Sequence, residues 1–137
     1  MNFFLLPPSR VTIIAIALLM LFTVTADAAT APTRDEWLPV EEAVLKERED
    51  AEQLLQNIAT KFPKWPVGFR ELARWQWNHG NSEACLANAQ KALALDAADA
   101  DAGTLAIQAL TQLGKGAESF AIADRFIGAK DGKGWVK

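Results

Sequence analysis

From about residue 30 onward, apolar side chains recur every three or four residues, with charged and amide side chains between them. This spacing is typical of helices that bury one face. Few segments alternate strictly between apolar and polar residues, as half-buried strands do, so we expect an all-α domain. One apolar stripe has intervals of seven, four and three residues: Val44, Ala51, Leu55, Ile58 and Phe62. It predicts a single long first helix over about residues 40–62, with Thr33 and Glu36 at capping-box spacing before it.

Prolines, glycines and cap residues divide the rest of the domain into four more helices. Pro63 and Pro66 separate the first helix from the second, and Gly80 and Gly114 are suited to end helices. Asn81 and Asp99 can cap the helices that follow them. The expected helices cover residues 66–79, 82–95, 100–113 and 117–127. We expect residues 129–137 to form a flexible tail.

The helical part of the chain repeats at an offset of 34 residues. Gly80 is matched by Gly114. The flanking pairs are Leu72 with Ala106, Cys85 with Ser119, Leu86 with Phe120, Ala89 with Ala123, and Leu93 with Ile127. Units of this length are helical hairpins that cannot bury their apolar faces alone and therefore stack into solenoids, whose usual activity is binding.

Residues 80–96, GNSEACLANAQKALALD, are similar to the second half of the tetratricopeptide repeat. They contain its glycine turn, a small residue at Cys85, the sequence Gln-Lys-Ala-Leu and an acidic stop. Ala97 stands where the family usually has a closing proline. The resemblance implies two hairpin units, over residues 66–96 and 100–128, stacked in a short solenoid with the long first helix as a half-unit.

Other positions agree less well with the family. Phe69, Leu72 and Ala73 stand where large, large and small apolar residues are expected, whereas Gln76 occupies a position that is usually aromatic. In the next unit, Ile107 stands where a small residue is usual.

The apolar run of residues 11–24 follows Arg10 and precedes Ala26-Asp27-Ala28. A basic start, an apolar centre and a small-residue site are the features of a secretory signal peptide, with cleavage expected after Ala28. Residues 1–28 are then removed, and residues 29–137 form the mature domain in the periplasm or outside the cell. In the alternative, the run stays as an anchor and the protein is an accessory subunit of an inner-membrane envelope complex.

Charge and composition narrow the classes of function. The formal net charge of −3 and the absence of a basic stripe argue against nucleic-acid binding. Cys85 is the only cysteine and His79 the only histidine, so no metal-ligand set is expected. We expect Cys85 to be a buried thiol and His79 a helix-end residue. No catalytic motif occurs, so we predict neither an enzyme nor a cofactor; a small redox or hydrolytic factor using His79 or Cys85 is the unsupported alternative.

In the tetratricopeptide family, the open arc of each first helix lines a concave groove that holds peptides. The resemblance therefore implies a groove that binds a peptide or a protein partner, lined by Val67, Arg70, Arg74, Trp77, Asn78, Asp101, Thr104, Gln108, Thr111 and Gln112. Arg70 and Arg74, one turn apart, can bind a carboxylate or a phosphate. In the alternative, they pair with Glu71 or with the acidic first helix. If the groove is open, replacing Arg70, Arg74 and Trp77 by alanine should leave the stability nearly unchanged.

The last predicted helix ends the array with Phe120, Phe126 and Ile127. Because terminal repeats need a polar cap, we expect this apolar end to be covered. Either Trp135 of the tail covers it, or another chain does. That chain is a second copy, as a homodimer through the C-terminal end, or a partner subunit.

Overall fold

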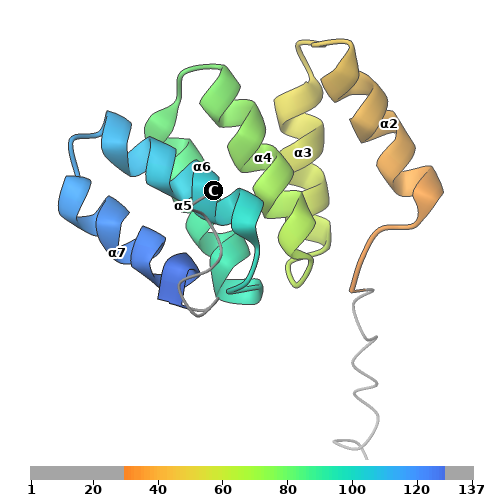
Figure 1. Cartoon of the computed structure of the whole chain (residues 1–137). Coiled ribbons are helices and arrows are strands. Elements are labelled where there is room, and N and C mark those ends of the chain that lie inside the picture. Colours follow the sequence, from red (N-terminus) through yellow and green to blue (C-terminus); the bar gives the residue numbers. More distant parts are fainter. Residues whose placement is uncertain (1–29, 129–137) are drawn as a thin grey trace, which may run out of the picture.

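The computed structural model describes residues 30–128 and contains six helices in that range (Figure 1). They are α2 (Arg34–Leu45), α3 (Ala51–Lys61), α4 (Pro66–Asn78), α5 (Ser82–Leu95), α6 (Ala100–Gln112) and α7 (Gly116–Gly128). Each helix packs against the next along the chain, and the described residues contain no strand. The prediction of an all-α domain is confirmed. The predicted signal peptide, residues 1–28, and the predicted tail, residues 129–137, lie outside the described residues.

The prediction of one long helix over residues 40–62 is wrong, because this region forms two helices, α2 and α3. The chain reverses over residues 46–50, five charged residues with no glycine or proline. The reversal packs Val40 of α2 against Leu55 and Ile58 of α3. A straight helix could not bring these side chains together, and burying their apolar surface favours the hairpin. The half-unit expected here is therefore a complete helical hairpin.

Three helices, α2, α4 and α6, end in the same hydrogen-bonded turn. A residue with positive φ lies in each turn: Glu47 at 49°, Gly80 at 77° and Gly114 at 74°. The next amide N–H donates to a carbonyl five residues back, in the pairs Arg48 to Ala43, Asn81 to Gln76 and Lys115 to Leu110. This is the Schellman arrangement, which satisfies carbonyls at the end of a helix. The turns predicted at Gly80 and Gly114 are confirmed, and Glu47 occupies the equivalent place in the first hairpin.

Replacing Glu47 by glycine should stabilise the protein by about 1 kcal/mol, because a side chain in the left-handed region is strained by roughly that amount. The free energy of unfolding in urea measures this gain. Glu47→Ala keeps the Cβ atom and is the matched control. Equal stabilities for the two variants would contradict the assigned turn.

Side-chain caps mark the starts of α2, α5 and α6. Thr33 and Glu36 form the predicted capping box, but at the start of α2 at Arg34, six residues before the predicted start at residue 40. The side chain of Asn81 accepts a hydrogen bond from the Ala84 N–H at 3.1 Å, and that of Asp99 accepts one from the Ala102 N–H at 3.0 Å. The predicted caps of α5 and α6 are therefore confirmed.

Glu36 also ties α2 to α3. The Lys61 ammonium donates to its Oε1 at 2.6 Å, and the Thr33 N–H donates to its Oε2 at 2.8 Å. The hydrogen bond from Lys61, followed by those from Thr33, lowers the pKa of Glu36 from 4.5 to about 2. Since the pKa is lower in the folded chain, the ionised carboxylate contributes stability above pH 4.5 that is lost as the pH falls toward 2.

The stability difference between the wild type and Glu36→Gln should therefore be present at pH 6 and vanish near pH 2. Thermal unfolding across this range tests the expectation. Lys61→Gln, which removes the principal donor, should lose much of the same acid dependence. A difference that persists unchanged at pH 2 would show that Glu36 acts through packing rather than charge.

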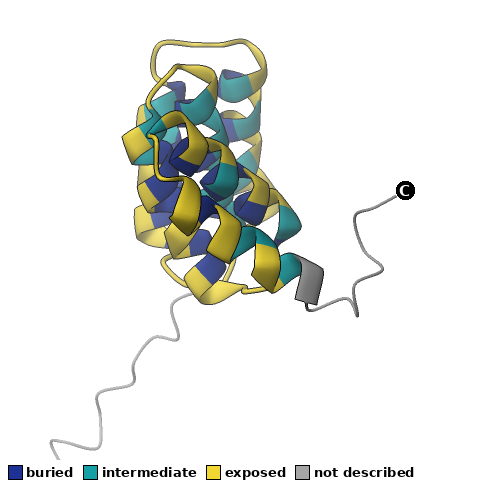
Figure 2. Cartoon of the chain, turned by 60° about the vertical axis from the view of Figure 1, so that its left-hand side comes forward, coloured by how far each residue is buried: buried dark blue, intermediate teal, exposed yellow. Residues whose placement is uncertain are grey.

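The core consists of two clusters that share α4. The buried residues lie toward the inside of the bundle, and exposed residues cover its outside (Figure 2). Leu72 belongs to the cluster of α2, α3 and α4, while its neighbour Ala73 belongs to the cluster of α4, α5 and α6. Trp65 packs edge-on against Trp37 with ring centroids 5.3 Å apart. Trp65 and Trp75 both pack against the first cluster, as expected for tryptophans that fill a small domain.

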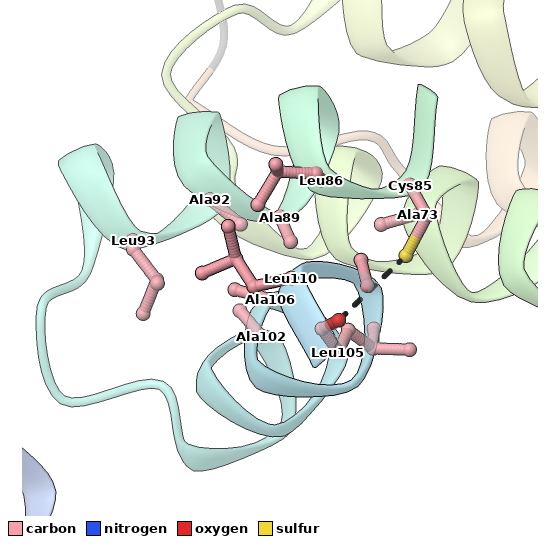
Figure 3. Close-up of a cluster of buried hydrophobic side chains, with 11 residues drawn as sticks. Ala73, Cys85, Leu86, Ala89, Ala92, Leu93, Ala102, Leu105, Ala106 and Leu110 are labelled. Atoms are coloured by element: carbon pink, nitrogen blue, oxygen red, sulfur yellow. Dashed lines mark hydrogen bonds between the residues drawn. The ribbon is translucent and has the colours of Figure 1, made fainter. Parts of the chain in front are cut away.

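Cys85 lies in the second cluster, between α5 and α6 (Figure 3). Its side chain is fully buried, and its Sγ lies 3.9 Å from the carbonyl oxygen of Leu105. Burial raises the pKa of the thiol from 9.0 to about 11. The expectation of a buried thiol is confirmed.

Native Cys85 should react with a thiol reagent at pH 8 at least 100-fold more slowly than the same thiol in the urea-unfolded chain, because it is both protonated and shielded. If labelling requires local opening of the native chain, each tenfold decrease in the labelling rate corresponds to about 1.4 kcal/mol in the free energy of that opening. Labelling followed by mass spectrometry measures both rates. Comparable rates would contradict the placement of Cys85.

The α6–α7 contact is made possible by a glycine. A Cβ atom at Gly103 would lie 2.2 Å from Cε2 of Phe126, so the ring of Phe126 occupies the space that a side chain at position 103 would need. Phe126 is therefore partly buried against the core, whereas Phe120 is 74% exposed. Of the three residues of the predicted apolar end, Phe120 is exposed and Phe126 packs against the core. The side chain of the third, Ile127, is not among those that the structure describes.

Candidate binding face

The predicted groove residues lie on α4 and α6, which contact each other directly. α2 packs on α3. We name the outward residues of α4 and α6, taken together with those of α2 described below, the α2–α4–α6 face. Four of its predicted residues are partly buried: Val67, Arg70, Arg74 and Trp77. The other six are exposed: Asn78, Asp101, Thr104, Gln108, Thr111 and Gln112.

Arg70 is part of an ion-pair network between α4 and the start of α6. Its guanidinium lies 3.2 Å from Asp99 and 3.3 Å from Glu71. The side chain of Asp99 is only 5% exposed, so this pair is shielded from water. Burial lowers the pKa of Arg70, but the charges and hydrogen bonds of Asp99 and Glu71 outweigh it, so the pKa is raised. Arg70 therefore holds two helices together.

Arg74 extends the same network toward solvent. It pairs with Glu71 at 2.8 Å and with Asp101 at 3.2 Å. Both arginines thus have carboxylate partners within the chain, as in the second of the two alternatives given above. One partner is Glu71, as that alternative named. The others are Asp99 and Asp101, rather than acids of the first helix. A ligand carboxylate or phosphate would have to displace these partners.

Trp77 is partly buried against the core of α4, α5 and α6, not held in an open groove. The burial of Trp77 and the pairing of Arg70 change the expectation for the stability of the triple alanine variant. Replacing Arg70, Arg74 and Trp77 by alanine should now lower the stability, because two of the three side chains join α4 to its neighbours. This triple variant would confuse loss of binding with loss of folding.

The exposed hydroxyl and amide side chains of α6 differ in what they can offer a partner. Thr104 donates to the carbonyl of Ala100, and Thr111 to that of Ile107, both at 2.8 Å. Their donors are thus satisfied within the helix. Gln108 and Gln112 are exposed and form no side-chain hydrogen bond within the described residues. These two amides are the groups of α6 best suited to pair with a peptide backbone.

The outward residues of α2 were not predicted from the sequence. Aligning Glu47 with Gly80 places Leu45 at the position of the predicted groove residue Asn78, and Leu38 at that of Glu71, which is next to the predicted groove residue Arg70. Leu38 is 47% exposed and Leu45 is 78% exposed. They border a shallow hollow of about 370 Å³ with Arg34 and Glu41. The positive-φ turn at Glu47 would have identified this helix, but no glycine marks it.

His79 and Cys85, the residues of the enzymatic alternative, have structural contacts. The ring of His79 stacks on Trp75 with centroids 4.1 Å apart, and its Nδ1 lies 2.8 Å from the Trp75 carbonyl oxygen. Cys85 is enclosed by the core. Within residues 30–128, no group of three His, Cys, Asp or Glu side chains is placed to hold a metal ion. None of the helices in this range has the length and apolar character needed to span a membrane.

No protein-family model matches the chain, and no match was found among curated proteins.

Proposed function

We propose that the protein is a tetratricopeptide-like binding module, exported to the periplasm or secreted, that holds a peptide or a partner protein on its α2–α4–α6 face. The principal support is the turn shared by three hairpins, at Glu47, Gly80 and Gly114. Equivalent turns at a near-constant period are typical of stacked helical repeats, and stacked repeats present the first helices of their units as a continuous surface.

The chemistry of this face favours a neutral or basic partner with apolar side chains. The arginines of α4 are neutralised by Glu71, Asp99 and Asp101. What remains available is an apolar area at Leu38 and Leu45 and the amides of α6. A peptide that inserts apolar side chains beside α2 and pairs its backbone with the amides of α6 fits these groups. An anion clamp built on Arg70 and Arg74 does not form part of the proposal.

A quantitative pulldown from envelope extract tests the proposal. Leu45→Asp and Gln108→Glu change exposed positions of the α2–α4–α6 face and should leave the melting temperature within a few degrees of the wild type, since surface changes away from specific contacts usually alter stability by less than about 0.5 kcal/mol. Recovery of a partner should fall at least fivefold for the double variant. The charge-matched control is Ala97→Asp with Ala98→Asp, at exposed positions in the turn between α5 and α6. Equal recovery by both double variants would contradict the proposed face.

Export is a separate part of the proposal, supported by the sequence of residues 1–28. Comparing the size of the cellular protein with that of a chain beginning at Ala29 tests it. A match, together with release from the periplasm by osmotic shock, is expected. A larger form that remains with membranes would instead favour the anchored alternative.

A further inference from the structure

A second surface of the molecule carries two pockets at equivalent positions of successive hairpins. One lies between α3 and α5 over α4, with a volume of about 290 Å³. The other lies between α5 and α7 over α6, with a volume of about 380 Å³. At six positions, a residue that lines the first pocket has a counterpart 34 positions later that lines the second. The pairs are Gln56 and Gln90, Ala59 and Leu93, Thr60 and Ala94, Gln76 and Leu110, Asn88 and Ile122, and Lys91 and Arg125.

The two pockets have similar rims, except that the carboxylate of Glu118 on α7 also lines the second pocket. Each has a glutamine on one wall, Gln56 or Gln90, and a basic side chain on the other, Lys91 or Arg125. Within residues 30–128, no carboxylate lies within ion-pair distance of Lys91 or Arg125. The Lys91 ammonium lies 5.5 Å from the centroid of the Phe69 ring at the floor of the first pocket. These cations are available to a ligand, unlike the arginines of α4.

The floors of the pockets differ. In the first, Asn88 donates from Nδ2 to Gln76 Oε1 at 2.8 Å and to the Ala84 carbonyl at 3.2 Å. Gln76 in turn donates to Glu52 at 3.0 Å. This network uses the donors of Asn88, and its Oδ1 accepts no hydrogen bond within the described residues, so the pocket offers an acceptor. The corresponding part of the second pocket is apolar, with Leu110 and Ile122 in place of Gln76 and Asn88.

We propose that the α3–α5–α7 face, defined by these two pockets, binds an extended acidic segment of a partner protein. An amide side chain of the segment enters the first pocket and an apolar side chain enters the second. Carboxylates beside them pair with Lys91 and Arg125. The two pockets are related by the step from α4 to α6, about 8 to 10 Å for helices in contact. A segment in the polyproline II conformation rises about 3.1 Å per residue and turns once every three residues, so two side chains three residues apart point to the same side and lie about 9 Å from each other.

Fluorescence anisotropy with synthetic peptides tests this assignment. The probes are acetyl-Glu-Leu-Glu-Glu-Gln-Glu-amide and its reverse order, acetyl-Glu-Gln-Glu-Glu-Leu-Glu-amide, each with an added fluorophore. At least one order should bind. Replacing the glutamates of that peptide by lysines should abolish binding, and replacing its leucine by serine should weaken it about fivefold or more, as expected for losing one buried apolar side chain.

Variants of the protein locate the site. Lys91→Gln and Arg125→Gln should each weaken binding about fivefold, and the double variant about 25-fold if the two pairs act independently. Lys115→Gln removes an exposed charge in the α6–α7 turn and should change the affinity less than twofold. In ¹H–¹⁵N spectra, the side-chain amide signals of Gln56, Asn88 and Gln90 should shift on binding.

Three results would overturn the inference. The first is the absence of binding at millimolar peptide. The second is an equal loss from Lys115→Gln, which would indicate non-specific attraction. The third is loss of binding in the Leu45→Asp and Gln108→Glu variant, which would place the peptide on the α2–α4–α6 face. That double variant also separates this inference from the proposed function, because the two predict effects on different ligands.

Discussion

Leu55→Ala is expected to lower the free energy of unfolding by about 2 to 5 kcal/mol, the range for removing a fully buried leucine. Leu55 is 0% exposed and belongs to the cluster that joins α2 and α3 to α4. Because that cluster includes Leu72 of α4, the loss should destabilise the whole domain. Urea unfolding followed by circular dichroism should therefore show a single transition at a lower midpoint with an unchanged slope.

Leu45→Ala is the matched control. Leu45 is 78% exposed on α2, so its replacement should change the stability by less than about 0.5 kcal/mol. A Leu55→Ala variant that unfolds in two separate steps would show that α2 and α3 form an independent unit. A cost below about 1 kcal/mol would contradict the placement of Leu55 in the core.

Asp99→Ala is expected to cost about 2 to 4 kcal/mol, because it removes a helix cap and a shielded ion pair together. Asp99 accepts the Ala102 N–H at the start of α6 and lies 3.2 Å from the guanidinium of Arg70. Its loss leaves Arg70, whose side chain is 23% exposed, with Glu71 as its remaining partner. Thermal and urea unfolding both measure the cost.

Asp99→Asn separates the two contributions, because asparagine can cap the helix but carries no charge. It should cost less than Asp99→Ala. A double-mutant cycle with Arg70→Met should give a coupling energy of about 0.5 to 3 kcal/mol between Arg70 and Asp99. Additive effects of Arg70→Met and Asp99→Asn would show that the pair contributes little, and Arg70 would again be a candidate for ligand binding.

The helices that the sequence predicted well are those with strong local signals. Pro66, Asn81 and Asp99 mark helix starts, and Gly80 and Gly114 mark ends, so α4, α5 and α6 begin and end within a residue of the expected positions. Local rules suffice there because caps and glycine turns are decided by the residues that form them.

The first hairpin could not be predicted in the same way. Its turn contains Glu47 in a conformation that side chains rarely adopt, and its flanks are charged residues compatible with a continuous helix. Tertiary packing of Val40 on Leu55 and Ile58 decides the break. Because the break between α2 and α3 was not predicted, Leu38 and Leu45 were not assigned to a face. The faces of α2 can be assigned only when the end of the helix is known.

Helical periodicity put Arg70, Arg74 and Trp77 on one arc of α4, and pairing of the arginines with Glu71 was one of the two alternatives, but their contacts with α6 were not predicted. Periodicity places these residues on one side of α4, but it does not show which acids of α6 lie opposite. Asp99 and Asp101 are 29 and 27 residues away from their partners, and only the packing of α6 beside α4 brings them together. Burial of Trp77 against the core likewise depends on the neighbouring hairpin.

Photo-crosslinking in living cells can show whether the α2–α4–α6 face holds a partner. A photoreactive amino acid is placed in turn at Leu38, Asn78 and Gln108, one exposed position on each helix of the face, and at the control positions Lys64 and Ala98, which are exposed in the turns before α4 and α6. The account predicts that the three face positions crosslink the same envelope protein or peptide, identified by mass spectrometry, and that the controls do not. Crosslinking of that species from the control positions alone, or no crosslink from any position on the face, would contradict it.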